Sequence, residues 1–219
     1  MCKLLSKQEK NCKNCFLKYS QEGISKIEDT ISQCKNNCSE TERTLTICLD
    51  VETTGLYEMD EILQLSIIDE SSRVLFHSYF KPYANRKWKE AERINHISPD
   101  YIFDEKNHFP YPHEVLPDLY NIFNQTKTII GYNPSFDIGF LNEWHLISPD
   151  IEIIDVMEMF SPIYGEVKYY DEYTGETIYK YQKLSTCAKF FNYSFNAHDS
   201  LEDTKATLYC YKKIIEHNA

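Results

Sequence analysis

A short apolar run that ends in two carboxylates is the feature that most constrains this sequence. Residues 44–51 read TLTICLDV, the composition of a strand buried within a sheet. Asp50 and Glu52 stand two residues apart at its C-terminal end, so their side chains point to the same face of a strand. Unpaired, they would repel each other, and a shared divalent cation such as Mg²⁺ resolves that repulsion. The alternative is a solvated strand end that runs into the turn at 53–55.

The rest of the chain predicts further strands and helices. In order we expect a strand at 44–51, an antiparallel meander at 61–70 and 74–80, a helix at 113–123, a strand at 127–132, a helix from Pro134 to about Trp144, a strand at 151–154, a hairpin at 169–181 around Thr174-Gly175, and helices at 183–191 and 201–217. Three early strands followed by alternating helices and strands indicate an α/β fold, with a mixed sheet flanked by helices on both faces.

Charge and hydropathy narrow the class of protein. The 219 residues carry a net charge of −11, which disfavours non-specific coating of a duplex. A small site filled with metal ions can still grip one strand end, because bound cations reverse the local sign. No apolar run approaches the roughly 18 residues that cross a bilayer, and the N-terminus lacks the apolar core of a signal peptide. We therefore expect a cytoplasmic protein with no membrane partner.

Residues 1–41 differ in composition from residues 42–219, which predicts a cysteine-rich leader followed by one larger domain. The leader holds five of the eight cysteines. Two close pairs, Cys12 with Cys15 and Cys34 with Cys38, have a spacing that suits a structural Zn²⁺ in a reducing compartment. Residues 24–31 are compatible with a helix, so a zinc-stapled helical hairpin is one reading. A tail whose cysteines are incidental is the other.

Two more acidic positions have both an ordinary and a functional explanation. Asp137 falls in the first turn of the helix that Pro134 begins, where the helix dipole favours any acid. Ser200 and Asp203 resemble a helix capping box, which would leave His198 as a surface loop residue. Alternatively, His198 lies free to deprotonate a water near neutral pH, and Asp203 completes a metal site with the carboxylates of the strand.

Together the segments LDVETTGL (49–56), GYNPSFDIGFL (131–141) and HDSLED (198–203) resemble the three motifs of the DEDDh exonuclease family. That family includes the proofreading epsilon subunits of bacterial replicative polymerases, RNase T and oligoribonuclease. The resemblance covers about residues 44–215 and includes INHIS (94–98), which is similar to a short family segment between the first two motifs.

The resemblance implies a ribonuclease-H-like fold with a five-stranded sheet, and hydrolysis with two Mg²⁺ or Mn²⁺ ions. Asp50, Glu52, Asp137 and Asp203 match the metal ligands, and His198 matches the general base. Such metal pairs stabilise the attacking and the leaving oxygens of an in-line displacement.

The resemblance also implies substrate contacts. Thr53 matches the position that touches the 3′-hydroxyl, and Leu56 the one that packs on the last base; Asn133 and Phe136 match second-motif positions near the strand end. Two departures leave all ligands in place. Tyr132 stands where many members have His, and Ser200 replaces a common Ala.

We therefore expect a metal-dependent 3′→5′ exonuclease that hydrolyses a DNA 3′ end, preferably single-stranded, and releases nucleoside 5′-monophosphates. An RNA-directed exoribonuclease like RNase T or oligoribonuclease is the alternative, and a non-catalytic scaffold that binds a partner through the leader is the third reading. A DNA polymerase or another replication or repair protein is the partner that the resemblance suggests.

Overall fold

A five-stranded mixed sheet forms the centre of the molecule in a computed structural model that describes residues 21–37, 43–57 and 59–218. The strand order is β3-β2-β1-β4-β5, with β1 at Leu45–Thr53, β2 at Ile62–Asp69, β3 at Val74–Tyr79, β4 at Thr126–Gly131 and β5 at Glu152–Asp155. The first three strands form an antiparallel meander, and β4 and β5 continue the sheet in parallel with β1. The predicted fold class is confirmed.

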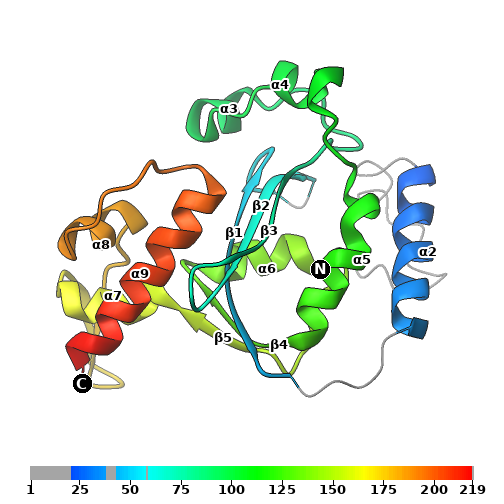
Figure 1. Cartoon of the computed structure of the whole chain (residues 1–219). Coiled ribbons are helices and arrows are strands. Elements are labelled where there is room, and N and C mark those ends of the chain that lie inside the picture. The colour runs from blue at the N-terminus through cyan, green and yellow to red at the C-terminus, as the bar shows by residue number, and fades with distance from the viewer. Residues whose placement is uncertain (1–20, 38–42, 58, 219) are drawn as a thin grey trace.

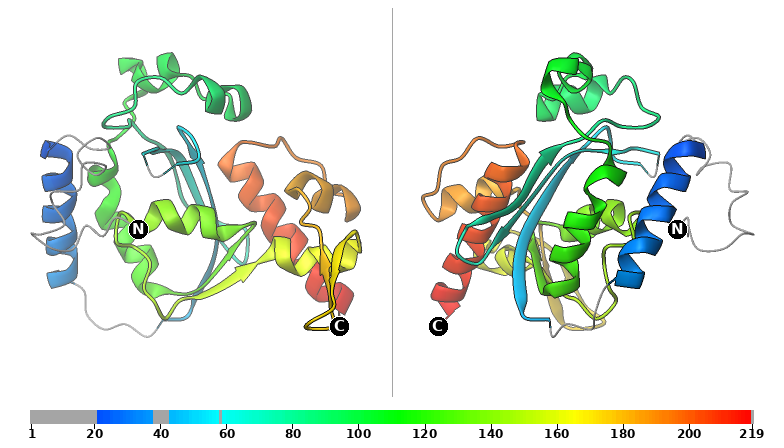
Figure 2. Two further views of the ribbon diagram at one scale, coloured as in Figure 1. Left: turned by 180° about the vertical axis from the view of Figure 1, so that it is seen from behind. Right: turned by 45° about the vertical axis from the view of Figure 1, so that its right-hand side comes forward.

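Helices cover both faces of the sheet (Figures 1 and 2). On one side lie α5 at Pro112–Gln125 and α6 at Pro134–Asn142, and on the other lie α7 at Val156–Tyr164, α8 at Leu184–Phe190 and α9 at Ser200–Asn218. Two short helices, α3 at Lys89–Asn95 and α4 at Pro99–Phe103, followed by the 3-10 turn η2 at Glu105–Asn107, stand above one end of the sheet. A separate hairpin is formed by β6 at Val167–Asp171 and β7 at Glu176–Tyr179.

The side chains of β1 alternate between two hydrophobic cores. Ile47, Leu49 and Val51 enter the core beneath α5 and α6, while Cys48 enters the core beneath α7, α8 and α9. This alternation follows from the two-residue repeat of a strand. Its consequence for function is that Asp50 and Glu52, in the same register as Cys48, face α9.

Most predicted elements are confirmed with ends shifted by a few residues, and four were not predicted. Helices α3, α4 and α7 and the turn η2 were missed. Each is short, and α7 contains an internal Pro162, which weakens a helical signal. These segments are held in place by packing, for instance around the buried Trp88 and Ile102 for α3 and α4.

Helix α2 at Gln21–Asn37 lies beside α5 (Figure 2). The helix predicted at 24–31 is thus confirmed as part of a longer one. Ile27 and Ile31 are buried in the same core as Leu116 and Phe123 of α5. Of the four cysteines proposed for zinc, Cys34 lies on α2, whereas Cys12, Cys15 and Cys38 lie outside the described residues.

No helix in the described part of the chain has both the length and the low polarity that crossing a membrane requires.

Replacing Ile31 with Ala should lower the free energy of unfolding by about 2–5 kcal/mol, because the change leaves a cavity between α2 and α5. Urea denaturation would measure the loss. The exposed Gln33 on the same helix, changed to Ala, is the matched control and should have little effect. Equal, small effects of both changes would show that α2 does not belong to the core.

Candidate active site

Asp50 and Glu52 form the centre of a polar face at the end of the sheet. Across the ladder, Asp50 lies opposite Ser66 and Glu52 opposite Gln64, so all four side chains share the face that α9 covers. Gln64 and Ser66 are fully buried. The same-face expectation for the two carboxylates is therefore met by the observed register.

Asp137 is brought to β1 by the turn from β4 into α6. A Cβ on Gly131 would lie 2.6 Å from the Cβ of Pro134, so this tight turn requires glycine. Pairing of β1 with β4 ends at Cys48, which leaves the amide of Val51 available. Val51 N donates a 2.9 Å hydrogen bond to Asp137 Oδ1. The buried Asp137 is thereby fixed beside the two carboxylates of β1.

The turn before α9 supplies His198, and the first turn of α9 supplies Asp203. Asp199 caps this helix, since its Oδ1 accepts hydrogen bonds from the amides of Leu201 and Glu202 at 3.1 Å each. Asp203 Oδ2 accepts from the amide of His198 at 3.0 Å. The capping role that the sequence suggested for Ser200 thus belongs to Asp199.

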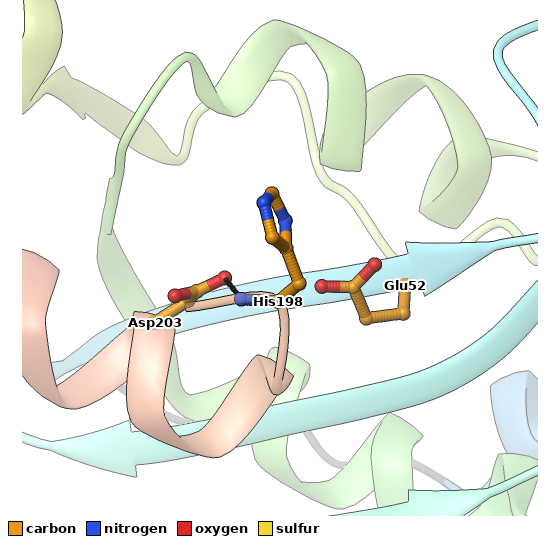
Figure 3. A group of neighbouring side chains, drawn as sticks. All are labelled: Glu52, His198 and Asp203. Carbon is orange, nitrogen blue, oxygen red and sulfur yellow. Dashed lines mark hydrogen bonds between the residues drawn. The ribbon is translucent and has the colours of Figure 1, made fainter. Parts of the chain in front are cut away.

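Glu52, His198 and Asp203 are neighbours in the fold (Figure 3). One ligand atom from each lies within 4.8 Å of those of the other two. Glu52 comes from β1, His198 from the turn before α9 and Asp203 from α9, so segments far apart in the sequence build the cluster.

Burial and repulsion between negative charges raise the pKa of four carboxyl groups in this region, those of Asp50, Glu52, Asp137 and Asp203. Burial, then the negative charges of Asp137 and Asp203, hold the pKa of Asp50 well above its usual value. Burial and Asp203 raise the pKa of Glu52 to about 8. Burial is also the main cause that raises the pKa of Asp137 and of Asp203, each to about 7. These groups therefore lack a positive partner within the described protein.

His198 shows the opposite shift. Partial burial, together with the positive charges of His96 and Lys183, lowers its pKa below the usual value. The neutral imidazole, which can accept a proton, is favoured at neutral pH.

The donor set fits a hard divalent cation. Asp203 Oδ1 is buried, and no hydrogen-bond partner for it exists among the described residues. Carboxylate oxygens are the ligands that Mg²⁺ and Mn²⁺ prefer. A cation would supply the missing partner and offset the repulsion that raises the four pKa values.

The four residues predicted to touch substrate differ in their exposure and in their contacts. Leu56 is 76% exposed beyond the end of β1. Thr53 is buried, and its hydroxyl donates to Gly55 O at 2.6 Å. Asn133 is exposed with a left-handed backbone, and its amide donates to Asp155 Oδ1 at 3.1 Å. Phe136 packs on the ring of Phe140. Their contacts with substrate stay predictions.

The side chains at the two departures from the family pattern make hydrogen bonds within the fold. Tyr132 donates its hydroxyl hydrogen to Gln182 O at 2.8 Å. Ser200 Oγ lies 2.6 Å from Ser66 Oγ in the interior. Both side chains thus make internal contacts of the fold.

Several supporting residues were not identified from the sequence. Gln64 and Ser66 sit in an apolar strand, and buried polar residues in such a run are the signal that was overlooked. Asn95 donates from its Nδ2 to Thr53 O at 3.1 Å and so ties α3 to the end of β1. Asp155 caps α7 and holds the amide of Asn133.

Comparison with known proteins identifies one matching family model and several relatives. The model described as Exonuclease, RNase T, matches residues 47–211. The PolC-type DNA polymerase III of Bacillus subtilis is 25% identical over 189 residues, which are 79% of this chain and 12% of the polymerase. That of Lacticaseibacillus paracasei is 26% identical over 176 residues, 74% of this chain and 11% of the polymerase. The chain thus spans only about an eighth of these relatives' length.

Solved structures share the fold. Escherichia coli Exonuclease I in complex with a dA16 oligonucleotide aligns with a TM-score of 0.61 at 20% identity, over 80% of this chain and 41% of that one. The Neurospora crassa Pan2 catalytic unit aligns with a TM-score of 0.59 at 19% identity, over 83% of this chain and 29% of that one. Exonuclease X in complex with 5′ overhanging duplex DNA aligns with 0.54 at 17% identity, over 78% and 92%.

Replacing Asp50 with Asn should raise the melting temperature in EDTA, because it removes a carboxyl group whose charged form is disfavoured in the folded state by burial and by the neighbouring carboxylates. A gain of about 1 kcal/mol corresponds to roughly 2–4 °C in a chain of this size. Adding Mg²⁺ or Mn²⁺ should stabilise the wild type and have much less effect on the variant. Differential scanning calorimetry with and without metal measures both.

Asp69 is the matched control for this experiment. Burial alone would raise the pKa of Asp69, but hydrogen bonds from Arg73 and Ser71 bring this pKa below its usual value. The folded state therefore favours its charged form, and Asp69→Asn should not raise the melting temperature. A variant Asp50→Asn that melts below the wild type in EDTA would contradict the repulsion.

Proposed function

We propose that this chain, which belongs to the RNase T family of exonucleases, hydrolyses phosphodiester bonds stepwise from the 3′ end of DNA and releases nucleoside 5′-monophosphates. The observation that carries the proposal is the closeness of Glu52, His198 and Asp203, whose ligand atoms lie within 4.8 Å of one another, next to the buried Asp137 and the half-buried Asp50. These are the five positions that match the family motifs, and the fold brings them together.

DNA is the proposed substrate because the relatives and structural neighbours include proteins that act on or bind DNA. Two are DNA polymerases, and two of the structural neighbours were solved with DNA, one with dA16 and one with an overhanging duplex. We propose single-stranded DNA as the preferred form, and a DNA polymerase or another replication or repair protein as the partner. The leader at 1–41, with a zinc site at Cys12, Cys15, Cys34 and Cys38, is the proposed docking segment.

Asp50, Glu52, Asp137 and Asp203 are the residues that would hold two Mg²⁺ or Mn²⁺ ions. When bound, such ions stabilise the negative charge that develops on the attacking and leaving oxygens. The four carboxylates come from β1, α6 and α9, and both helices pack against β1, so the relative positions of the carboxylates are set by the fold. Preorganised ligands of this kind need little reorganisation during the reaction.

His198 is the proposed general base. An imidazole nitrogen accepts the proton of the attacking water, and the lowered pKa of His198 keeps that nitrogen unprotonated at neutral pH. The exposure of His198 at the rim gives the water access. Asp203 restrains the histidine by accepting the hydrogen bond of its amide.

Thr53, Leu56, Asn133 and Phe136 are the proposed contacts with the terminal nucleotides. Leu56 is the most exposed apolar side chain among them and offers a surface for a base. It follows Glu52 by one tight turn, so a base packed on it lies next to the carboxylates.

Digestion of 5′-labelled DNA and RNA oligonucleotides with Mg²⁺ or Mn²⁺ tests the function. We expect the wild type to produce a ladder of DNA shortened from the 3′ end, and Asp50→Asn to produce none. A faster ladder on RNA would replace the proposed substrate with RNA. Cleavage at internal positions of the oligonucleotide would overturn the proposal. So would an Asp50→Asn variant as active as the wild type.

Replacing His198 with Ala should lower kcat by about 10²–10⁴-fold, the usual contribution of a general base, while thermal stabilisation by Mg²⁺ remains. The exposed His217 at the other end of α9, changed to Ala, is the control. Loss of the stabilisation by Mg²⁺ in His198→Ala would instead make this histidine a metal ligand.

Replacing Leu56 with Ala should raise KM several-fold with a smaller change in kcat, because the base loses its packing surface. Steady-state kinetics on single-stranded DNA would measure this. Ile215, also exposed but on the last turns of α9, is the control when changed to Ala. If KM stays the same, Leu56 does not contact the substrate.

A further inference from the structure

Gln64 is a buried polar side chain for which the reaction has no direct use. It is 1% exposed and lies in β2, a strand that is otherwise almost wholly apolar. Its Oε1 accepts a 3.0 Å hydrogen bond from the amide of Ser200. Its Nε2 donates to Asp199 Oδ2 at 3.4 Å. Both ends of the amide therefore contact the two residues that follow His198.

These contacts complete the N-terminal cap of α9. The first amides of a helix have no partner within the helix. Here Ser200 N donates to Gln64, Leu201 N and Glu202 N donate to Asp199 Oδ1, and Asp203 N donates to Asp199 O at 2.9 Å. One carboxylate thus carries much of the cap, and the Gln64 amide holds that carboxylate from the sheet side.

Ser66 adds a second attachment of the same turn to β2. Its Oγ lies 2.6 Å from Ser200 Oγ and 2.8 Å from His77 Nδ1. Ser66 and Ser200 are both fully buried. Because Ser200 stands where the family commonly has Ala, this attachment is a feature of the present chain.

Gln64 also lies directly opposite Glu52 in the β1–β2 ladder. The side chain of Gln64 therefore connects β2, the strand that pairs with β1 at Glu52, with the turn between His198 and Asp203. His198 itself is exposed and has a left-handed backbone, with φ of 70°. Its position relative to Glu52 depends on how this turn is attached to the sheet.

We infer that Gln64 is a positioning residue for the general base: by holding Asp199 and Ser200 it sets the place of His198 relative to Glu52 and Asp203. This inference rests on the proposed function. Misplacement of a reacting group by 1 Å can cost about 100-fold in rate. Loss of both hydrogen bonds of Gln64 should therefore lower kcat more than it changes substrate affinity.

The kinetic test is a double-mutant cycle with His198. Gln64→Met keeps the length of the side chain and removes both hydrogen bonds. We expect it to lower kcat about 10–100-fold, with KM within twofold of the wild type. In the background of His198→Ala the same change should have almost no further effect, because the group that it misplaces is gone.

Hydrogen exchange of the Ser200 and Leu201 amides gives a readout that does not need activity. Measured without metal, both amides should exchange at least tenfold faster in Gln64→Met than in the wild type. Thr128→Val is the matched control: Thr128 is also buried in the sheet, on β4, but its hydroxyl donates to Glu152 Oε2 of β5 and not to the turn that precedes α9. It should change neither the exchange nor kcat.

Gln64→Glu is the second variant if Gln64→Met does not fold. It keeps an oxygen to accept from Ser200 N but turns a carboxylate toward Asp199. Protection of Ser200 should then survive while that of Leu201 falls, and kcat should lie between those of the wild type and Gln64→Met.

The inference is overturned if Gln64→Met lowers kcat equally with and without His198, or if the two amides stay protected. A wild type without nuclease activity would refute the proposed function alone. Exchange at Ser200 would still decide whether Gln64 holds the turn.

Discussion

The hydrogen bond from Val51 N to Asp137 joins α6 to β1 at the point between Asp50 and Glu52. It replaces a rung of the sheet, because the ladder between β1 and β4 ends three residues earlier. Through this bond a third carboxylate enters a face that already holds two. The arrangement is unfavourable without a cation, since burial and repulsion raise the pKa of each group. The hydrophobic packing in the rest of the fold offsets this unfavourable free energy.

The backbone that carries the carboxylates is stabilised because the sheet has an apolar part and a polar part. Beneath α5 and α6 the centre of the sheet is apolar, with Ile47, Leu49 and Val51 in one core. Beneath α9 the face begins with Cys48, Ile68 and Ile130 and becomes polar toward the ends of the strands. A continuous core thus fixes the backbone of β1, and only the side chains at its end form the site.

Helix α9 contributes to both parts. Its middle packs into the core through Leu208, Cys210 and Ile214. Its first turn presents Asp203, whose two oxygens differ: one accepts the amide of His198, and the other is buried without a hydrogen-bond partner in the described structure. Since Asp199 supplies the cap, Asp203 is available for another role. The capping explanation and the functional explanation of this segment therefore apply to different residues.

The sequence by itself determined the class of fold and predicted the residues of the candidate site. The strand-like run at 44–51 has a two-residue repeat, so it settles which face Asp50 and Glu52 share, and the three motifs predict which residues join them. The tertiary structure decided what holds these residues in place. Gln64 and Ser66 are separated from Ser200 by 136 and 134 positions in the chain, and Asn95 from Thr53 by 42. A hydrogen bond over such a distance leaves no local pattern. Helices α3 and α4 also leave no clear local pattern in the sequence, because they are short and depend on packing around Trp88. Local periodicity reports the face of a strand or helix, whereas the partner on the other side of that face exists only once the chain has folded.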